Sequence, residues 1–187
     1  MAQDPSDSVP ARHRPWTIIT ALLAAAVLVA ADLALKNWAQ INLTDNRVQP
    51  LIPKLLAMRW VENHGAIFGI AQGQRLFFIA ATIIATAAIT WIFVRAPVRH
   101  RFLQVALVLI LAGALGNLHD RVWHQFVRDM LWLFPQVPLP FNWHWPGGSN
   151  ELYPWIFNLA DVYLVIGIAI LIIRSIFIKP PAPADPN

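Results

Sequence analysis

The chain has no cysteine among its 187 residues, which excludes disulfide bonds, thiolate catalysis and cysteine-ligated metals. It is also poor in charge: 13% of residues are charged, against about a quarter in a soluble domain. No basic cluster is interleaved with aromatic residues, so we expect no nucleic-acid partner. The chain also lacks HExxH, G-x-S-x-G and phosphate-loop motifs. His119 and His124 are five residues apart, a poor spacing for one metal on a helix, and we expect neither metal nor cofactor.

Hydrophobic residues make up 57% of the chain and the mean hydropathy is +0.52. Four apolar segments approach the roughly 20 residues that a membrane-spanning helix needs. We therefore expect an all-α membrane protein, a single four-helix domain over residues 16–178, between a disordered N-terminus (1–15) and a tail (179–187). The predicted helices cover about 16–36, 76–95, 102–121 and 155–174. An alternative for the first segment is a cleaved signal peptide, because Arg12 and Arg14 precede it and "VAA" resembles a cleavage site.

Four spans place both termini on the same side of the membrane. The short loop "RAPVRHR" has the densest positive charge of any short loop, with Arg95, Arg99 and Arg101. The positive-inside rule makes this loop and both termini cytoplasmic. Residues of roughly 37–75 and 119–157 then form two outer segments.

The two outer segments differ in character. "KLLAMRWVEN" in the first has a mixed alternation that favours an extended strand. The second holds five of the nine tryptophans and five prolines, which suits an amphipathic loop rather than a long helix. Tryptophan at this density is typical of the membrane–water interface. The alternative is an apolar loop folded on itself.

Polar residues gather at the outer ends of the predicted helices. Asn117, Asp120 and Arg121 share one helical face because they are three and four residues apart. Asn158 and Asp161 begin the fourth segment at the same end. Asp32 and Lys36, spaced by four residues, end the first segment at that level. An ionisable group at membrane depth costs at least about 2.5 kcal/mol, which makes Asp161 a candidate functional residue. The alternative is that Asp161 caps the helix in the headgroup layer.

Two carboxylates held close together in a partly dry site share a proton, and their pKa values split. One can then accept a proton from water while the other donates, the pattern of aspartic proteases. A proton relay in a small transporter would look similar, but it predicts an inverted internal repeat, and we find none. A non-catalytic scaffold that binds a partner through the Trp-rich segment is the other alternative. It leaves the cost of Asp161 unexplained.

Four motifs resemble those of the lipoprotein signal peptidases (signal peptidase II). "AGALGNLHDRV" resembles the family's G-x-x-G-N-x-x-D-R block, and "FNLADVYLVIG" resembles its F-N-x-A-D block. "ENHGAIFGI" is similar to its N-x-G-A-x-F block, and "DLALK" to its D-x-x-x-K block. The motifs occur in the family's order, and the resemblance covers roughly residues 16–178.

The resemblance implies a bacterial inner-membrane aspartic endopeptidase, without metal or cofactor, active near the outer face. Such enzymes remove signal peptides from prolipoproteins, before a cysteine that carries diacylglycerol. The implied partners are these lipidated substrates and membrane lipids, and we expect a monomer. The implied catalytic pair is Asp120 and Asp161. Supporting positions carried over from the motifs are Asn63, Gly65, Ala66, Asn117, Arg121, Asn158, Asp32 and Lys36. Asp129 matches the family's outer V-x-D position, and we expect it to order the loop rather than to react.

Three departures from the family pattern stand out. Ala112 replaces a frequent glycine, and Arg128 precedes Asp129 where an apolar residue is common. The stretch between Asp129 and Asn158 is longer than usual. These departures concern helix packing and the substrate entrance.

Overall fold

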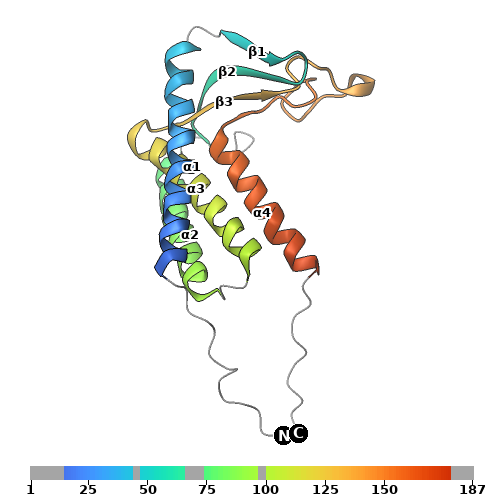
Figure 1. Cartoon of the computed structure of the whole chain (residues 1–187). Helices are drawn as coiled ribbons and strands as arrows, with labels where there is room; N and C mark the ends of the chain where they lie inside the picture. The colour runs from blue at the N-terminus through green and yellow to red at the C-terminus, as the bar shows by residue number, and fades with distance from the viewer. Residues whose placement is uncertain (1–14, 44–46, 66–73, 97–99, 178–187) are drawn as a thin grey trace, which may run out of the picture.

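A bundle of four helices carries a small sheet across one end (Figure 1). The computed structural model describes residues 15–43, 47–65, 74–96 and 100–177. The helices are α1 (Pro15–Asn42), α2 (Arg75–Arg95), α3 (Arg101–Trp123) and α4 (Leu159–Phe177). All four are long and apolar enough to cross a membrane. A helix satisfies all its backbone groups internally, as hydrocarbon requires. The predicted four-helix membrane bundle is therefore confirmed, while the predicted terminal tails lie outside the described residues.

The sheet comes from both outer segments. Its antiparallel strands are β1 (Val48–Ile52), β2 (Leu56–Asn63), β3 (Val127–Leu133) and β4 (Ile156–Phe157), in the order β1-β2-β3-β4. The expected extended stretch in the first outer segment is confirmed as β2. The register pairs Val61 with Asp129 and Leu131 with Phe157. The sheet thus brings residues from two distant parts of the chain to the bundle's end.

Two helices depart by more than three residues at one end from their predicted bounds. α1 continues to Asn42 rather than ending near Lys36. Its last turns stay ordered because Ala39 and the adjoining Leu43 pack with Met58 and Met130 in a core between helix and sheet. α4 begins at Leu159 rather than at 155, because residues 156 and 157 pair with β3 instead.

Helix α3 is the centre of the bundle and packs against α1, α2 and α4. Its small residues let the neighbouring helices approach closely. A Cβ at Gly113 would overlap the backbone carbonyl of Ala160 on α4. A Cβ at Gly116 would lie 2.6 Å from Asp32 Oδ2 on α1. Glycine at these two positions therefore allows polar residues of three helices to meet at one level.

The second outer segment forms an irregular hairpin between β3 and β4, which we call the aromatic arm (residues 134–155). Its two halves are joined by backbone hydrogen bonds, such as Leu152 N–H to the Val137 carbonyl at 2.7 Å. The rings of Trp145 and Trp155 pack edge to face with centroids 4.8 Å apart. At the tip, Phe141 is 86% exposed. The arm folds on itself at its base and leaves aromatic side chains exposed at its tip; its membrane contact stays a prediction.

Candidate active site

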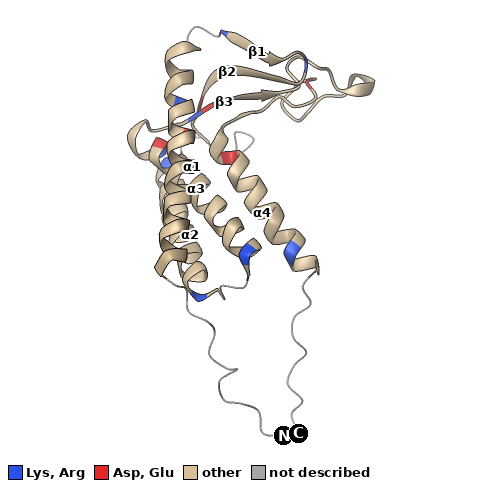
Figure 2. Cartoon of the chain, in the orientation of Figure 1, with Lys and Arg blue, Asp and Glu red and all other residues tan. Residues whose placement is uncertain are grey.

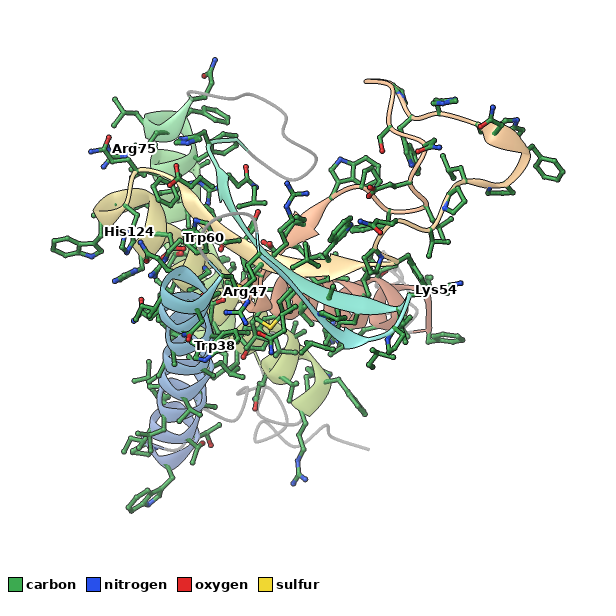
Figure 3. The ribbon with its side chains drawn as sticks, turned by 90° about the horizontal axis from the view of Figure 1, so that it is seen from above. Trp38, Arg47, Lys54, Trp60, Arg75 and His124 are labelled. Carbon is green, nitrogen blue, oxygen red and sulfur yellow. The ribbon has the colours of Figure 1, made fainter. Side chains whose placement is uncertain are left out.

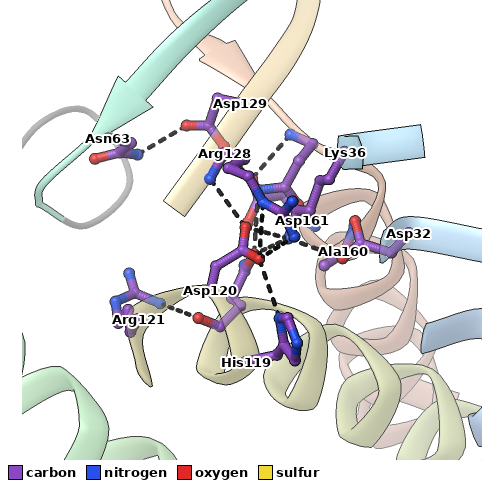
Figure 4. Close-up of polar contacts among 12 residues, drawn as sticks. Asp32, Lys36, Asn63, His119, Asp120, Arg121, Arg128, Asp129, Ala160 and Asp161 are labelled. Carbon is purple, nitrogen blue, oxygen red and sulfur yellow. Dashed lines mark hydrogen bonds and ion pairs between the residues drawn. The ribbon is translucent and has the colours of Figure 1, made fainter. Parts of the chain in front are cut away.

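Four charged side chains meet where the sheet rests on the bundle (Figure 4). They are Asp32 and Lys36 from α1, Asp120 from α3 and Arg128 from β3, and each is at most 1% exposed. Lys36 Nζ lies 2.8 Å from Asp32 Oδ2 and 3.3 Å from Asp120 Oδ2. We call these four residues the ion-pair network. Its two positive and two negative charges balance, which limits the cost of burying them.

The Asp120 carboxylate is enclosed by donors of this network. Its Oδ1 accepts from Arg128 Nε at 3.1 Å and from Arg128 Nη2 at 2.7 Å. Its Oδ2 accepts from the Arg128 backbone N–H at 3.0 Å and faces Lys36. Within the described residues, no hydrogen bond or ion pair joins Asp120 to Asp161. The structure therefore places the predicted partner of Asp161 in a closed cluster of charges.

Asp161 lies in the first turn of α4, in a reciprocal cap with Asn158. Asn158 Oδ1 accepts from the Asp161 backbone N–H at 3.0 Å, and Asp161 Oδ2 accepts from the Asn158 N–H at 3.1 Å. This is the geometry of a capping box. Asp32 adds a contact from α1, since its Oδ1 accepts from the Ala160 N–H at 2.9 Å. The helix terminus thus fixes the Asp161 side chain, and its N–H groups offset part of the cost of burying a negative charge there.

Asn117 links the ion-pair network to Asp161. Its Oδ1 accepts from Lys36 Nζ at 3.0 Å and from Asn158 Nδ2 at 3.1 Å. Since an ammonium group only donates, Lys36 fixes which end of the amide faces it. The Asn117 Nδ2 therefore points the other way and donates to Asp161 Oδ1 at 2.8 Å.

The carboxylate brought beside Asp161 is that of Asp129, on β3. Asn158 contacts both groups, because its Nδ2 donates to Asp129 Oδ1 at 2.7 Å while its backbone N–H donates to Asp161. Asp129 Oδ2 accepts from Asn63 Nδ2 at 2.9 Å. Burial, with the negative charge of Asp161, raises the pKa of Asp129 to about 7. Asp129 and Asp161, which we call the aspartate pair, can hold one proton between them near neutral pH.

The remaining predicted residues line one side of the pair. Asn63 Oδ1 accepts from the Gly65 N–H at 2.9 Å, which closes the turn after β2. Arg121 Nη2 donates to the Gly65 carbonyl at 3.1 Å, and its guanidinium lies over the ring of Phe78, 5.0 Å from the centroid. The structure thus groups Asn63, Gly65 and Arg121 as predicted from the motifs. Ala66 lies outside the described residues.

A histidine pair lies on the outer side of Asp120. His119, Asp120 and His124 present ligand atoms within 4.8 Å of one another, closer than their sequence spacing suggested. Both oxygens of Asp120 already face donors of Arg128 and Lys36. Any cation here would compete with two fixed positive charges, so the geometry does not favour a metal site.

A family model described as signal peptidase (SPase) II matches residues 24–177. The chain belongs to the signal peptidase II family. The lipoprotein signal peptidase of Streptococcus thermophilus is 32% identical over 160 residues, covering 86% of this chain and 92% of its own. That of Serratia proteamaculans is 31% identical over 158 residues, covering 82% and 84%.

Solved structures agree with this assignment. A bacterial membrane enzyme determined by the in meso method at 2.3 Å superposes with a TM-score of 0.74 at 29% identity, covering 91% of this chain and 95% of that chain. A second, determined at 1.9 Å, gives a TM-score of 0.72 and covers 91% and 99%. The signal peptidase II family is a family of membrane peptidases, and this chain is a multi-pass membrane protein of that type.

Within this signal peptidase II chain, sequence reasoning identified Asp161 and both asparagines but gave Asp129 only a loop-ordering role. The signal for Asp129 was weak, because its position depends on the pairing of β3 with β2 across the sheet. Arg128 was noted only as a departure from the family pattern. A basic residue directly before Asp129, in an otherwise apolar "FVRDMLWL", does indicate a buried partner of opposite charge.

Proposed function

We propose that the protein removes signal peptides from prolipoproteins, cutting before a diacylglyceryl-modified cysteine, and that Asp129 and Asp161 activate the attacking water. This proposal keeps Asp161 from the sequence prediction and replaces Asp120 with Asp129. The observation that carries it is the double contact of Asn158, which holds the two carboxylates side by side. The relatives' name, lipoprotein signal peptidase, supports a prolipoprotein substrate, and its diacylglyceryl group is what the family resemblance implies.

The proposed mechanism needs no covalent intermediate. The ionised carboxylate takes a proton from water as the water oxygen attacks the scissile carbonyl carbon. The protonated carboxyl gives its proton to the carbonyl oxygen, which forms a tetrahedral gem-diol. Collapse of this intermediate breaks the C–N bond: the first carboxyl gives its proton to the leaving nitrogen, and the second carboxylate takes back a proton from a gem-diol hydroxyl, which restores both groups. The N–H donors around Asp161 suit that carboxylate as the initial base, and the raised pKa of Asp129 suits it as the initial acid.

The position of the pair suits a substrate anchored in lipid. The aspartate pair lies at the bundle end that carries the sheet, and Arg95, Arg101 and Arg174 mark the opposite end (Figure 2). By the positive-inside rule, the arginine end faces the cytoplasm and the sheet faces outward. A bond next to a lipidated cysteine lies at the outer membrane surface, and the carboxylates must reach that depth.

The experiment is a gel-shift cleavage assay with purified protein in detergent and a diacylglyceryl-modified preprolipoprotein. Wild type should convert the substrate to the shorter mature form. Asp161→Asn and Asp129→Asn should fold and fail to cleave, while unlipidated substrate should be cut poorly by wild type. Well-folded wild type that leaves the lipidated substrate intact would refute the proposed function.

A further inference from the structure

Arg128 is buried to 1% exposure and joins three elements of the structure. Its Nε and Nη2 donate to Asp120 on α3, and its Nη1 donates to Asn37 and Gln40 on α1. Its own backbone N–H also donates to Asp120. β3 is therefore tied to two membrane helices at the residue immediately before Asp129.

Adjacent strand residues project to opposite faces of a sheet. Arg128 accordingly reaches toward α1 and α3, while Asp129 reaches toward Asn63 and Asn158 (Figure 4). Fixing Arg128 on one face fixes the height and rotation of Asp129 on the other. A carboxylate whose task depends on facing Asp161 is sensitive to such placement, since a displacement of about 1 Å can cost 10²-fold in rate.

Arg128 also balances the charge beside the aspartate pair. Without it, Lys36 would face both Asp32 and Asp120 alone, leaving one uncompensated negative charge in the ion-pair network. Lys36 donates to Asn117, which in turn donates to Asp161. A contiguous set of contacts therefore leads from Arg128 to Asp161, and the backbone leads directly to Asp129.

We propose that Arg128 is a positioning residue for the cleavage reaction: it anchors Asp129 opposite Asp161 and keeps the ion-pair network electrically neutral. This inference rests on the proposed function. Arg128 touches neither carboxylate of the pair with its side chain, so it acts through Asp120, Lys36 and the β3 backbone.

Titratable groups face this region from the helices and from the segments beside β3 and β4, and β2 places Glu62 opposite Arg128 in the register. Those that act on Asp129 and its surroundings are Lys36 from α1, Asp120, Arg121 and His119 from α3, His124 after α3, Tyr153 before β4, and Asp161 from α4. Arg128 differs from the others because it is a buried cation that lies on the same strand as Asp129. Its charge is therefore the one whose removal should change both placement and proton affinity.

The test compares four variants with wild type and Asp161→Asn in the lipidated-substrate assay across pH. Arg128→Met removes both the hydrogen bonds and the positive charge of the side chain. Arg128→Lys keeps the charge but loses the paired guanidinium hydrogen bonds to Asp120. Arg128→Met with Asp120→Asn removes one charge of each sign. Lys54→Met is the matched control, since it removes one positive charge from the far tip of the same sheet (Figure 3). Carboxyl-carbon NMR of labelled Asp129 gives its titration midpoint independently of activity.

Arg128→Met should lower kcat by about 10²-fold with KM changed less than about threefold. The alkaline limb of its pH–activity profile and the titration midpoint of Asp129 should both move to higher pH by roughly one unit, because a nearby positive charge is lost. The double variant should return the limb to the wild-type position while kcat stays low. Arg128→Lys should lower kcat without moving the limb, and Lys54→Met should match wild type.

A folded Arg128→Met protein with wild-type kcat, or with an unchanged Asp129 midpoint, would overturn the inference. If Arg128→Met does not fold, Arg128→Lys decides, and wild-type kcat there would overturn it equally. Absence of cleavage by folded wild type would instead refute the proposed function. The NMR midpoints of the variants would still test the role of Arg128 in that case.

Discussion

The ion-pair network and the aspartate pair lie side by side but satisfy their carboxylates in different ways. Asp32 and Asp120 face buried cations, at distances down to 2.7 Å. In the part of the chain that the structure describes, the hydrogen bonds that Asp129 and Asp161 accept come from side-chain amides and a backbone N–H group. Neutral donors orient a carboxylate without compensating its charge. The difference indicates how one site can hold two fixed negative charges and, next to them, the two carboxylates that share a proton in the proposed mechanism.

Asn117 lies between the ion-pair network and the aspartate pair and forms hydrogen bonds to both. Asn117 receives Lys36 on one side and offers its N–H to Asp161 on the other. Within the described residues, the Lys36 ammonium therefore makes no hydrogen bond or ion pair with Asp161, and the Asn117 amide lies between them. A direct ammonium contact would favour full ionisation of the pair, which would remove the acid that the proposed mechanism needs.

The largest contrast between the two regions should appear in catalysis. Asp129→Asn removes the group that we assign as initial acid and should reduce cleavage by more than about 10³-fold. Asp120→Asn should retain measurable turnover per folded molecule, because Asp120 is enclosed by Arg128 and Lys36. Single-turnover assays corrected for the folded fraction would measure this. If folded Asp120→Asn lost turnover while Asp129→Asn kept it, the catalytic pair would instead be Asp120 and Asp161, as the sequence resemblance implied.

The helices of this protein were predictable because hydrocarbon leaves a single segment few alternatives to helix. Asp161 and Asn158 were also predictable, since their contact is local to one helical turn. Asp129 was not, because its position depends on pairing between β2 and β3, which are more than sixty residues apart. Asp120 attracted attention through its spacing from Asn117. Asp120 forms a buried ion pair with Arg128. Arg128 comes from strand β3, and the sequence does not reveal the register of that strand.

The second contrast concerns the pH dependence of stability. The pKa of Asp129 is raised from 3.8 to about 7, so the folded state keeps a proton that the unfolded state has lost. Stability therefore falls as pH rises from about 4 to 7, by up to about 4 kcal/mol, and levels off above. Asp129→Asn should remove this pH dependence. Its amide, beside Asn63 and Asn158, can change the free energy of unfolding only by an amount that is the same at every pH.

Denaturant unfolding in mild detergent at pH 4.5, 6 and 8 would measure the slope. Glu62→Gln, at a half-exposed position on the same sheet, serves as the control and should keep the wild-type slope. Parallel curves for wild type and Asp129→Asn would show that Asp129 titrates alike in both states, against the raised pKa.

The third contrast is the stability cost of opening the ion-pair network. Asp120→Asn leaves Arg128 and Lys36 buried with only Asp32 to balance them. Breaking a buried pair is strongly destabilising, and we expect a loss of about 3 kcal/mol in the free energy of unfolding. Glu62→Gln breaks an exposed pair with His64 and should cost less than about 1 kcal/mol. Equal losses in the two variants would mean that the network is not specifically stabilising.

The smallest expected effect lies at the exposed tip of the aromatic arm, which is part of neither region (Figure 1). Phe141 is 86% exposed and Trp143 is 66% exposed, and their rings pack 6.1 Å apart at the tip. Exposed aromatic residues beside a membrane-spanning bundle suit the interface with lipid headgroups. Replacing both with serine should change turnover in lipid vesicles by less than about tenfold, and in detergent hardly at all.

The absence of native cysteine allows a direct measurement of this contact. A polarity-sensitive probe on Phe141→Cys should be quenched by lipid-borne quenchers in vesicles. The same probe on Asn150→Cys, exposed on the polar return of the arm, is the control and should be quenched less. Equal quenching at both positions, or none at Phe141, would mean that the arm projects into water. In that event, the arm's aromatic tip would be available to proteins rather than to lipid, and the serine variants should behave alike in vesicles and detergent.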